Sequence, residues 1–170
     1  MAKANPAGFA PLYHYYFEAI FRFVHRKVGS MDDAGDITSM AFMKAIANIG
    51  KYEDRGFPFS SWLYRIASNE VVMYFRKQKK DQVIRIDLKK ANLLVNEIDE
   101  DEEKEKLLHQ LTLTLKDMPE EIQTLIEYRF FDLLSFKEIG GILNINEDAA
   151  KRRVYRAVDK LRQGMKGGQA

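Results

Sequence analysis

Apolar residues recur at helical spacing along most of the chain, and this pattern predicts its elements. In the first half they fall three or four positions apart in three segments, Pro11 to Val28, about Asp32 to Ile49, and Phe59 or Ser60 to Lys80. Gly29 and Gly50 follow the first two segments, at positions where helices commonly end. The sequence therefore predicts three helices in this half, preceded by a flexible start over residues 1–10.

The second half continues in the same way after an acidic stretch. Residues 81–103 show no clear period and end in a run of acidic side chains, which is typical of a linker. Helical spacing returns from about Asp99 to Asp117 and from Glu120 to about Asp132, and no strand pattern persists anywhere. The predicted fold class is all-α: two small helical domains, residues 8–80 and 104–164, are joined by a flexible acidic linker, residues 81–103, and the C-terminal domain contains a helix–turn–helix.

The most specific local signals lie between residues 135 and 162. Ser135 and Glu138 have the spacing of a capping box, which predicts the start of a short helix. Asn144 follows the last apolar residue of that helix and tolerates the left-handed conformation in which helices often end. Asn146 is then a candidate N-cap for a longer helix. Together these residues predict the helix–turn–helix.

The second helix of this motif has two contrasting faces. Its apolar face carries Ala150, Val154, Ala157, Val158 and Leu161, and its basic face carries Lys151, Arg152, Arg153, Arg156, Lys160 and Arg162. A basic helix of this kind suits the DNA major groove, where an arginine can donate two hydrogen bonds to one guanine. The alternative interpretation is an antiparallel helix pair with a solvated charged face.

The net charge of +2 does not by itself indicate nucleic-acid binding, but its distribution is uneven. Residues 1–90 carry 15 Lys and Arg against 9 Asp and Glu, whereas residues 91–119 carry 3 against 8. The segment from Phe59 to Lys80 also joins aromatic residues to a basic end. Rings beside cations suit single-stranded nucleic acid, because bases stack while phosphates pair. A core tryptophan with a solvated basic helix end is an equally good interpretation.

The sequence offers no side-chain arrangement typical of an enzyme. It has no cysteine, which excludes disulfides, thiolate metal sites and thiol catalysis. His14, His25 and His109 each lack a second ligand at metal spacing, so we expect no metal, no cofactor and no catalytic residue. No apolar run approaches the roughly 20 residues that cross a bilayer, and the first residues lack a signal peptide's apolar core. We therefore expect a non-enzymatic protein without membrane insertion, and an intracellular location fits; the cytoplasmic location that we expect follows from the family resemblance described next.

Two parts of the chain carry a family resemblance. The first comprises Asp36-Ile-Thr-Ser-Met-Ala-Phe-Met-Lys-Ala-Ile46, Phe59-Ser-Ser-Trp-Leu-Tyr-Arg-Ile-Ala-Ser-Asn69 and Tyr74-Phe-Arg-Lys77; the second runs from Met118-Pro-Glu-Glu-Ile-Gln123 to Arg162. They resemble regions two and four of the extracytoplasmic-function (ECF) sigma factors. These are small two-domain promoter-recognition subunits of bacterial RNA polymerase, in the sigma-70 family. The string around Trp62 is quite specific, whereas other helix–turn–helix regulators share the second pattern.

The resemblance implies roles for three sets of residues. The residues implied to bind the clamp helices of the largest polymerase subunit are Asp36, Ile37, Phe42, Lys44 and Ala45. The residues implied to recognise and melt the −10 element lie in a loop and in the next helix. Those in the loop are Tyr52, Arg55 and Phe57, and those in the helix are Trp62, Arg65, Asn69, Tyr74, Arg76 and Lys77. The residues implied to recognise the −35 element are Lys151, Arg152, Arg153 and Arg156. Residues after Glu120 would also contact the flap of the second-largest subunit, and an anti-sigma factor is a common partner in this family.

The resulting hypothesis is a sigma factor that binds core RNA polymerase and directs promoter recognition for transcription initiation. The alternative is a stand-alone helix–turn–helix regulator that binds operators as a dimer. That alternative uses only residues 119–164 and leaves the string from Trp62 to Asn69 unexplained. It predicts a symmetric DNA site, whereas a sigma factor predicts an asymmetric site with two blocks. An enzyme with a site in a helical cleft is a third, weaker hypothesis.

Overall fold

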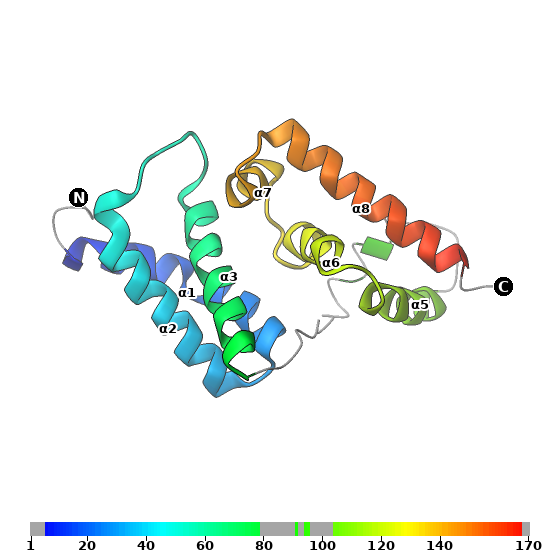
Figure 1. Cartoon of the computed structure of the whole chain (residues 1–170), viewed down its shortest axis with the longest axis horizontal. Coiled ribbons are helices and arrows are strands. Elements are labelled where there is room, and N and C mark those ends of the chain that lie inside the picture. Colours follow the sequence, from blue (N-terminus) through cyan, green and yellow to red (C-terminus); the bar gives the residue numbers. More distant parts are fainter. Residues whose placement is uncertain (1–5, 79–90, 92–93, 96–103, 168–170) are drawn as a thin grey trace. The chain divides into compact units, whose positions relative to one another are not determined.

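The computed structural model describes residues 6–78, 91, 94–95 and 104–167, and these residues form helices and connecting turns without any strand (Figure 1). The predicted all-α class is therefore confirmed. The chain divides into two compact units, Met1–Arg85 and Ile86–Ala170. Each unit is described separately below.

The first unit is built from three long helices with two short 3₁₀ segments. In chain order these are η1 (Pro6–Phe9), α1 (Ala10–Val28), α2 (Met31–Asn48), η2 (Ile49–Lys51) and α3 (Phe59–Gln78). Gly29 ends α1 in the left-handed region at φ 80°, and the Ser30 side chain caps α2 by accepting from the Asp33 N–H at 3.2 Å. The three predicted helices are thus confirmed, with ends shifted by one or two residues where they are described.

The core of the first unit lies between α1, α2 and α3, which all pack against one another. Ala34, Ala41 and Ala45 of α2 are fully buried, and such small residues allow neighbouring helices to approach closely. Phe9 is also buried, at 1% exposure, and packs edge-on against Phe42 with ring centroids 6.3 Å apart. The expected flexible start over residues 1–10 is therefore wrong for residues 6–10, because an aromatic anchor fixes them; residues 1–5 lie outside the described residues.

Between residues 104 and 167, the second unit contains four α-helices, with a π-helical turn between two of them. They are α5 (Lys104–Lys116), α6 (Glu120–Ile126), the π-helical η3 (Glu127–Phe131), α7 (Phe136–Leu143) and α8 (Glu147–Gly167). Helix α8 packs against α5, α6 and α7, so its apolar face forms the centre of the core. The five residues predicted for that face are all buried, and Met165 joins them. The predicted start of α5 near Asp99 lies outside the described residues.

Most of the predicted linker, residues 81–103, also lies outside the described residues. Ala91, Leu94 and Val95 are described, and all three are helical and buried. Apolar side chains at these positions therefore add to a core. The linker boundaries themselves stay a prediction.

Candidate nucleic-acid interface

The turn between α7 and α8 is held by the local contacts that the sequence predicts. The Ser135 hydroxyl accepts from the Glu138 N–H at 3.2 Å, and the Glu138 carboxylate accepts from the Ser135 N–H at 2.8 Å, which completes the capping box. Asn144 ends α7 in the left-handed conformation at φ 56°, ψ 44°. The Asn146 side chain then accepts from the Ala149 N–H at 2.8 Å at the start of α8. The helix–turn–helix is therefore confirmed residue by residue.

Gly140 determines how closely the two helices of this motif approach. A Cβ atom on Gly140 would lie 2.7 Å from the carbonyl oxygen of Ile145, which is closer than real contacts allow. The Gly140 carbonyl also accepts from the N–H groups of Asn144 and Ile145, the latter at 2.9 Å. Sequence analysis did not find this role, because the contact depends on how the chain returns after the turn.

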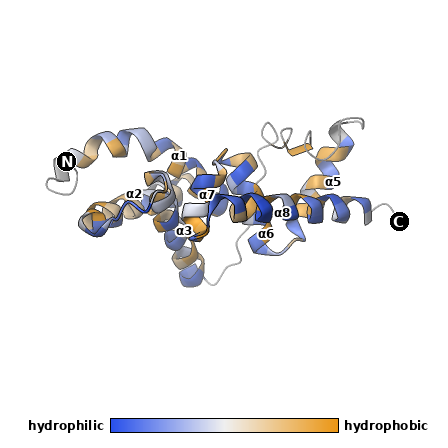
Figure 2. Cartoon of the chain, turned by 90° about the horizontal axis from the view of Figure 1, so that it is seen from above, coloured by the Kyte–Doolittle hydropathy of each residue, from blue (hydrophilic) through white to orange (hydrophobic). Residues whose placement is uncertain are grey.

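The cations predicted for −35 recognition lie on different sides of α8. Successive residues of a helix are rotated by about 100°, so Arg152 and Arg156 share the stripe opposite the buried residues. Arg153 is rotated towards α6, where its guanidinium lies 4.0 Å from the Glu121 carboxylate. Lys151 is rotated the other way, towards α7. Most of α8 is hydrophilic, as Figure 2 shows.

Tyr155 lies on the side of α8 that faces α7, next to the basic residues, and it was not among the residues predicted from the sequence. It is 42% exposed, and its ring lies 5.9 Å from that of Phe136 in α7. The Arg129 guanidinium in turn lies 4.6 Å from the centroid of the Phe136 ring and donates to the Leu134 carbonyl at 3.0 Å. Tyr155 therefore projects from a supported position beside Lys151, one turn away on the helix.

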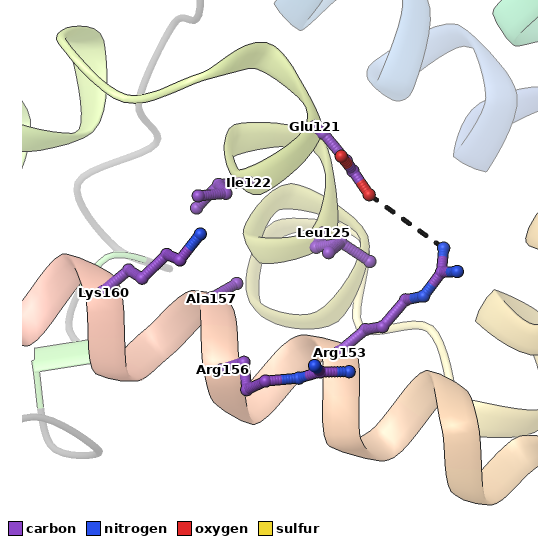
Figure 3. A pocket seen from close by; sticks show the side chains of 7 residues that line it. All are labelled: Glu121, Ile122, Leu125, Arg153, Arg156, Ala157 and Lys160. Carbon is purple, nitrogen blue, oxygen red and sulfur yellow. Dashed lines mark ion pairs between the residues drawn. The ribbon is translucent and has the colours of Figure 1, made fainter.

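On its other side, α8 forms a cavity of about 390 Å³ with α6. Ile122, Leu125 and Ala157 supply its apolar lining, and four charged residues complete it, Glu121, Arg153, Arg156 and Lys160 (Figure 3). The side chains of Arg153 and Glu121 point towards each other across its edge. The basic surface of α8 thus extends from the outward stripe onto the α6 side.

In the first unit, the loop before α3 places aromatic rings together. Tyr52, Phe59 and Trp62 have ring centroids 5.2–5.4 Å apart. Burial, and then the nearby Asp54 carboxylate, raises the pKa of the Tyr52 phenol. Gly56 takes a left-handed conformation at φ 78°, and the exposed Arg55 pairs with Glu53 at 3.0 Å. Phe57 is half-buried in the same loop.

The residues predicted for −10 recognition on α3 divide into two groups. Trp62, Arg65, Asn69 and Arg76 fall on one face by helical rotation, and all but the half-buried Trp62 are exposed. Tyr74 lies on another face, where its hydroxyl donates to the Asp33 carboxylate of α2 at 2.9 Å. That hydrogen bond, followed by burial and the Asp33 charge, raises the pKa of Tyr74. The exposed Lys77 lies between the two faces.

The residues predicted for polymerase binding differ in accessibility. Asp36 and Lys44 are exposed, and Lys44 forms an ion pair with Glu70 of α3, whose side chain is only 5% exposed. Ile37, Phe42 and Ala45 are 5%, 2% and 0% exposed. The prediction that these three contact a partner directly is corrected here, because they form the core beneath α2.

The exposed surface of α2 instead contains large apolar side chains that were not in the predicted set. Met40 and Met43 are both exposed. Met40 also lines a cavity of about 290 Å³ between α2 and α3, together with Asp36, Lys44 and Met73. Exposure of this kind is typical of interaction surfaces.

Two further features concern the described part of the chain. Its side chains include no group of three or more His, Asp or Glu residues that could hold a metal ion. None of its helices is long and apolar enough to cross a membrane.

Comparison with known proteins relates both units to the same protein family. Family models match residues 12–81, as sigma-70 region 2, and residues 114–163, as sigma-70 region 4. The ECF RNA polymerase sigma factor SigW of Bacillus subtilis is 31% identical, over 96% of this chain and 92% of SigW. SigM, another ECF sigma factor of that organism, is 26% identical over 89% of this chain and 91% of its own length. The solved structure of CnrH in complex with the cytosolic domain of CnrY shares the fold, with a TM-score of 0.61, 21% identity, and coverage of 94% of this chain and 88% of the other.

Proposed function

The chain belongs to the ECF sigma factors of the sigma-70 family, and we propose from this that it directs RNA polymerase to promoters through two DNA-binding surfaces, one on each unit. The surface on α8 would bind the −35 element as duplex DNA. The surface on α3 and its preceding loop would bind the −10 element as it opens. Sigma factors are DNA-binding regulators rather than enzymes, and we assign this chain no catalytic step.

The observation that carries the proposal is the outward stripe of α8 on a rigid turn. Arg152 and Arg156 project away from the core, and their helix is fixed by the capping box of α7 and by the Asn146 cap. A guanidinium held in this way can donate two hydrogen bonds to a guanine edge, which discriminates bases by about 1–3 kcal/mol. Duplex recognition of this kind requires a rigid helix.

The first unit supports a different kind of contact. The Trp62 ring packs at a tilted angle against those of Tyr52 and Phe59, next to the exposed Arg65 and Asn69. Base–aromatic stacking contributes about 1–3 kcal/mol per base in single-stranded complexes. A strand that has left the duplex offers such bases, so this surface suits the melted part of a promoter.

The partners follow from the family. We propose that core RNA polymerase binds the exposed surface of α2 through the clamp helices of its largest subunit, and binds the second unit through the flap of the second-largest subunit. Asp36 and Lys44 would take part in the former contact. The protein would act in the cytoplasm with the polymerase, and an anti-sigma factor would regulate it.

Run-off transcription with core RNA polymerase tests the proposal. Genomic fragments of the source bacterium would be transcribed with and without the protein, and we expect discrete new start sites that require it. Alignment of those sites would give an asymmetric promoter with two conserved blocks. An Arg152→Ala, Arg156→Ala double variant should lose these starts. Arg162→Ala serves as the control, because Arg162 pairs with Asp159 at 2.9 Å on the same helix. Tight binding to a symmetric site without polymerase, and no new transcripts, would contradict the proposal.

A further inference from the structure

The cavity between α6 and α8 contains a carboxylate among cations. Of the seven residues that line it, Glu121 alone is acidic, while Arg153, Arg156 and Lys160 are basic (Figure 3). Glu121 lies in the first turn of α6, where the helix dipole favours a negative charge.

The Glu121 carboxylate forms an ion pair with Arg153. Its side chain is 43% exposed and that of Glu121 is 78% exposed, and their charged atoms are 4.0 Å apart. Exposed pairs of this length are weak, because water and salt screen them. A phosphate oxygen that approaches Arg153 can therefore replace the carboxylate at little cost.

The direction of Arg153 separates it from the outward stripe. Arg152 projects opposite the buried face, towards the bases when α8 lies in a major groove. Arg156 lies next to it on that stripe and also reaches the edge of the cavity. Arg153 is rotated by about 100° towards α6, so it projects towards the wall of that groove, where phosphates lie.

We propose that Arg153 binds the DNA backbone instead of a base edge, and that on binding it exchanges the Glu121 carboxylate, its ion-pair partner on the α6 side, for a phosphate. This inference depends on the proposed function of α8. It assigns three of the four predicted −35 residues to two tasks, with Arg152 and Arg156 as base contacts and Arg153 as a phosphate contact. It also makes Glu121 a competitor of DNA for Arg153.

The test uses the full chain and measures fluorescence anisotropy of labelled duplex DNA, both random-sequence duplexes and promoter fragments from the run-off experiment. Glu121→Gln should tighten binding by about two- to fivefold, which corresponds to the strength of an exposed pair. The gain should be similar on every duplex. Between about 50 and 200 mM salt, the slope of log affinity against log salt should become steeper by up to about 0.9, the value for one phosphate contact.

Glu120→Gln is the matched control. It removes the same charge from the same helical turn, but Glu120 does not line the cavity that holds Arg153. Arg153→Ala should weaken binding uniformly and make the salt slope shallower, and it should abolish the effect of Glu121→Gln. Far-UV circular dichroism checks that the variants fold.

The outcomes separate the inference from the proposed function. If Glu121→Gln behaves as Glu120→Gln does, or if Arg153→Ala changes the preferred base at one position, the inference is overturned and the proposed function stands. If instead neither Arg152→Ala nor Arg156→Ala affects promoter binding with polymerase present, the role of α8 in DNA recognition fails as well.

Discussion

Replacing Gly140 by alanine should destabilise the second unit, although the same change in a helix is usually favourable. Alanine in place of glycine within a helix gains about 0.5–1 kcal/mol, because the unfolded chain loses freedom. At Gly140 this gain is opposed by the Ile145 carbonyl oxygen, which would lie 2.7 Å from the new Cβ. The oxygen belongs to the backbone of the turn, so it cannot move aside as a flexible side chain would.

The magnitude follows from two costs. Overpacking a tight site costs about 1–3 kcal/mol. Moving the turn also weakens the hydrogen bonds that the Gly140 carbonyl accepts from Asn144 and Ile145, each of which contributes about 0.5–1.5 kcal/mol. After the helix-propensity gain is subtracted, we expect a net loss of about 1–3 kcal/mol. Binding of duplex DNA should weaken too, because the turn sets the direction of α8.

Urea unfolding with two probes can locate this effect. Trp62 is the only tryptophan in the sequence and belongs to the first unit, so its fluorescence follows that unit, while circular dichroism follows both. Gly140→Ala should lower the urea midpoint of circular dichroism and leave the fluorescence midpoint unchanged. Gly35→Ala is the matched control: a Cβ added to Gly35 in α2 would meet no neighbouring atom within 4 Å, so this change should raise the fluorescence midpoint. An unchanged or raised midpoint for the second unit in Gly140→Ala would refute the reasoning.

Three further predictions concern the first unit. Lys44→Ala leaves the buried Glu70 carboxylate without its ion-pair partner. The free energy of unfolding should fall by about 1–3 kcal/mol, measured by Trp62 fluorescence in urea. Combining Lys44→Ala with Glu70→Gln should recover part of this loss. Asp33→Ala removes the main cause of the raised Tyr74 pKa, so one phenol should ionise at lower pH in an absorbance titration. In the native protein, the stability from this hydrogen bond is complete below about pH 10 and is lost as pH rises through the raised pKa of Tyr74. Phe42→Ala should destabilise the unit by about 3–5 kcal/mol and lose transcription because the unit unfolds; normal stability in that variant would contradict its place in the core.

The parts of the fold that the sequence predicts well depend on local contacts. The capping box of Ser135 and Glu138 and the left-handed Asn144 involve residues within one or two turns of each other, so their spacing in the chain determines their geometry. The apolar stripe of α8 is similar, because helical rotation alone places Val154 and Leu161 on one face.

The features that the sequence does not predict depend on packing between distant segments. Phe9 is ordered because it meets Phe42, which lies 33 positions later, and nothing near Phe9 in the chain indicates this. The tight contact at Gly140 and the pairing of Arg153 with Glu121 likewise arise only when separate helices come together. The π-helical end of the segment after α6 is a further case, since its residues follow an ordinary helical pattern.

The resemblance implies which residues bind the polymerase, and the structure shows which of those residues are exposed to a partner. The resemblance implies polymerase binding at Ile37, Phe42 and Ala45, yet these side chains are buried in the core beneath α2. Substitutions there would therefore act by unfolding the unit. Asp36 and Lys44 lie on the accessible side, next to the exposed Met40. Lys44 also stabilises the fold through Glu70, so a binding defect at Lys44 has two causes. Asp36 takes part in none of the ion pairs and hydrogen bonds found in the described residues, so Asp36→Ala would test the predicted polymerase contact separately from stability.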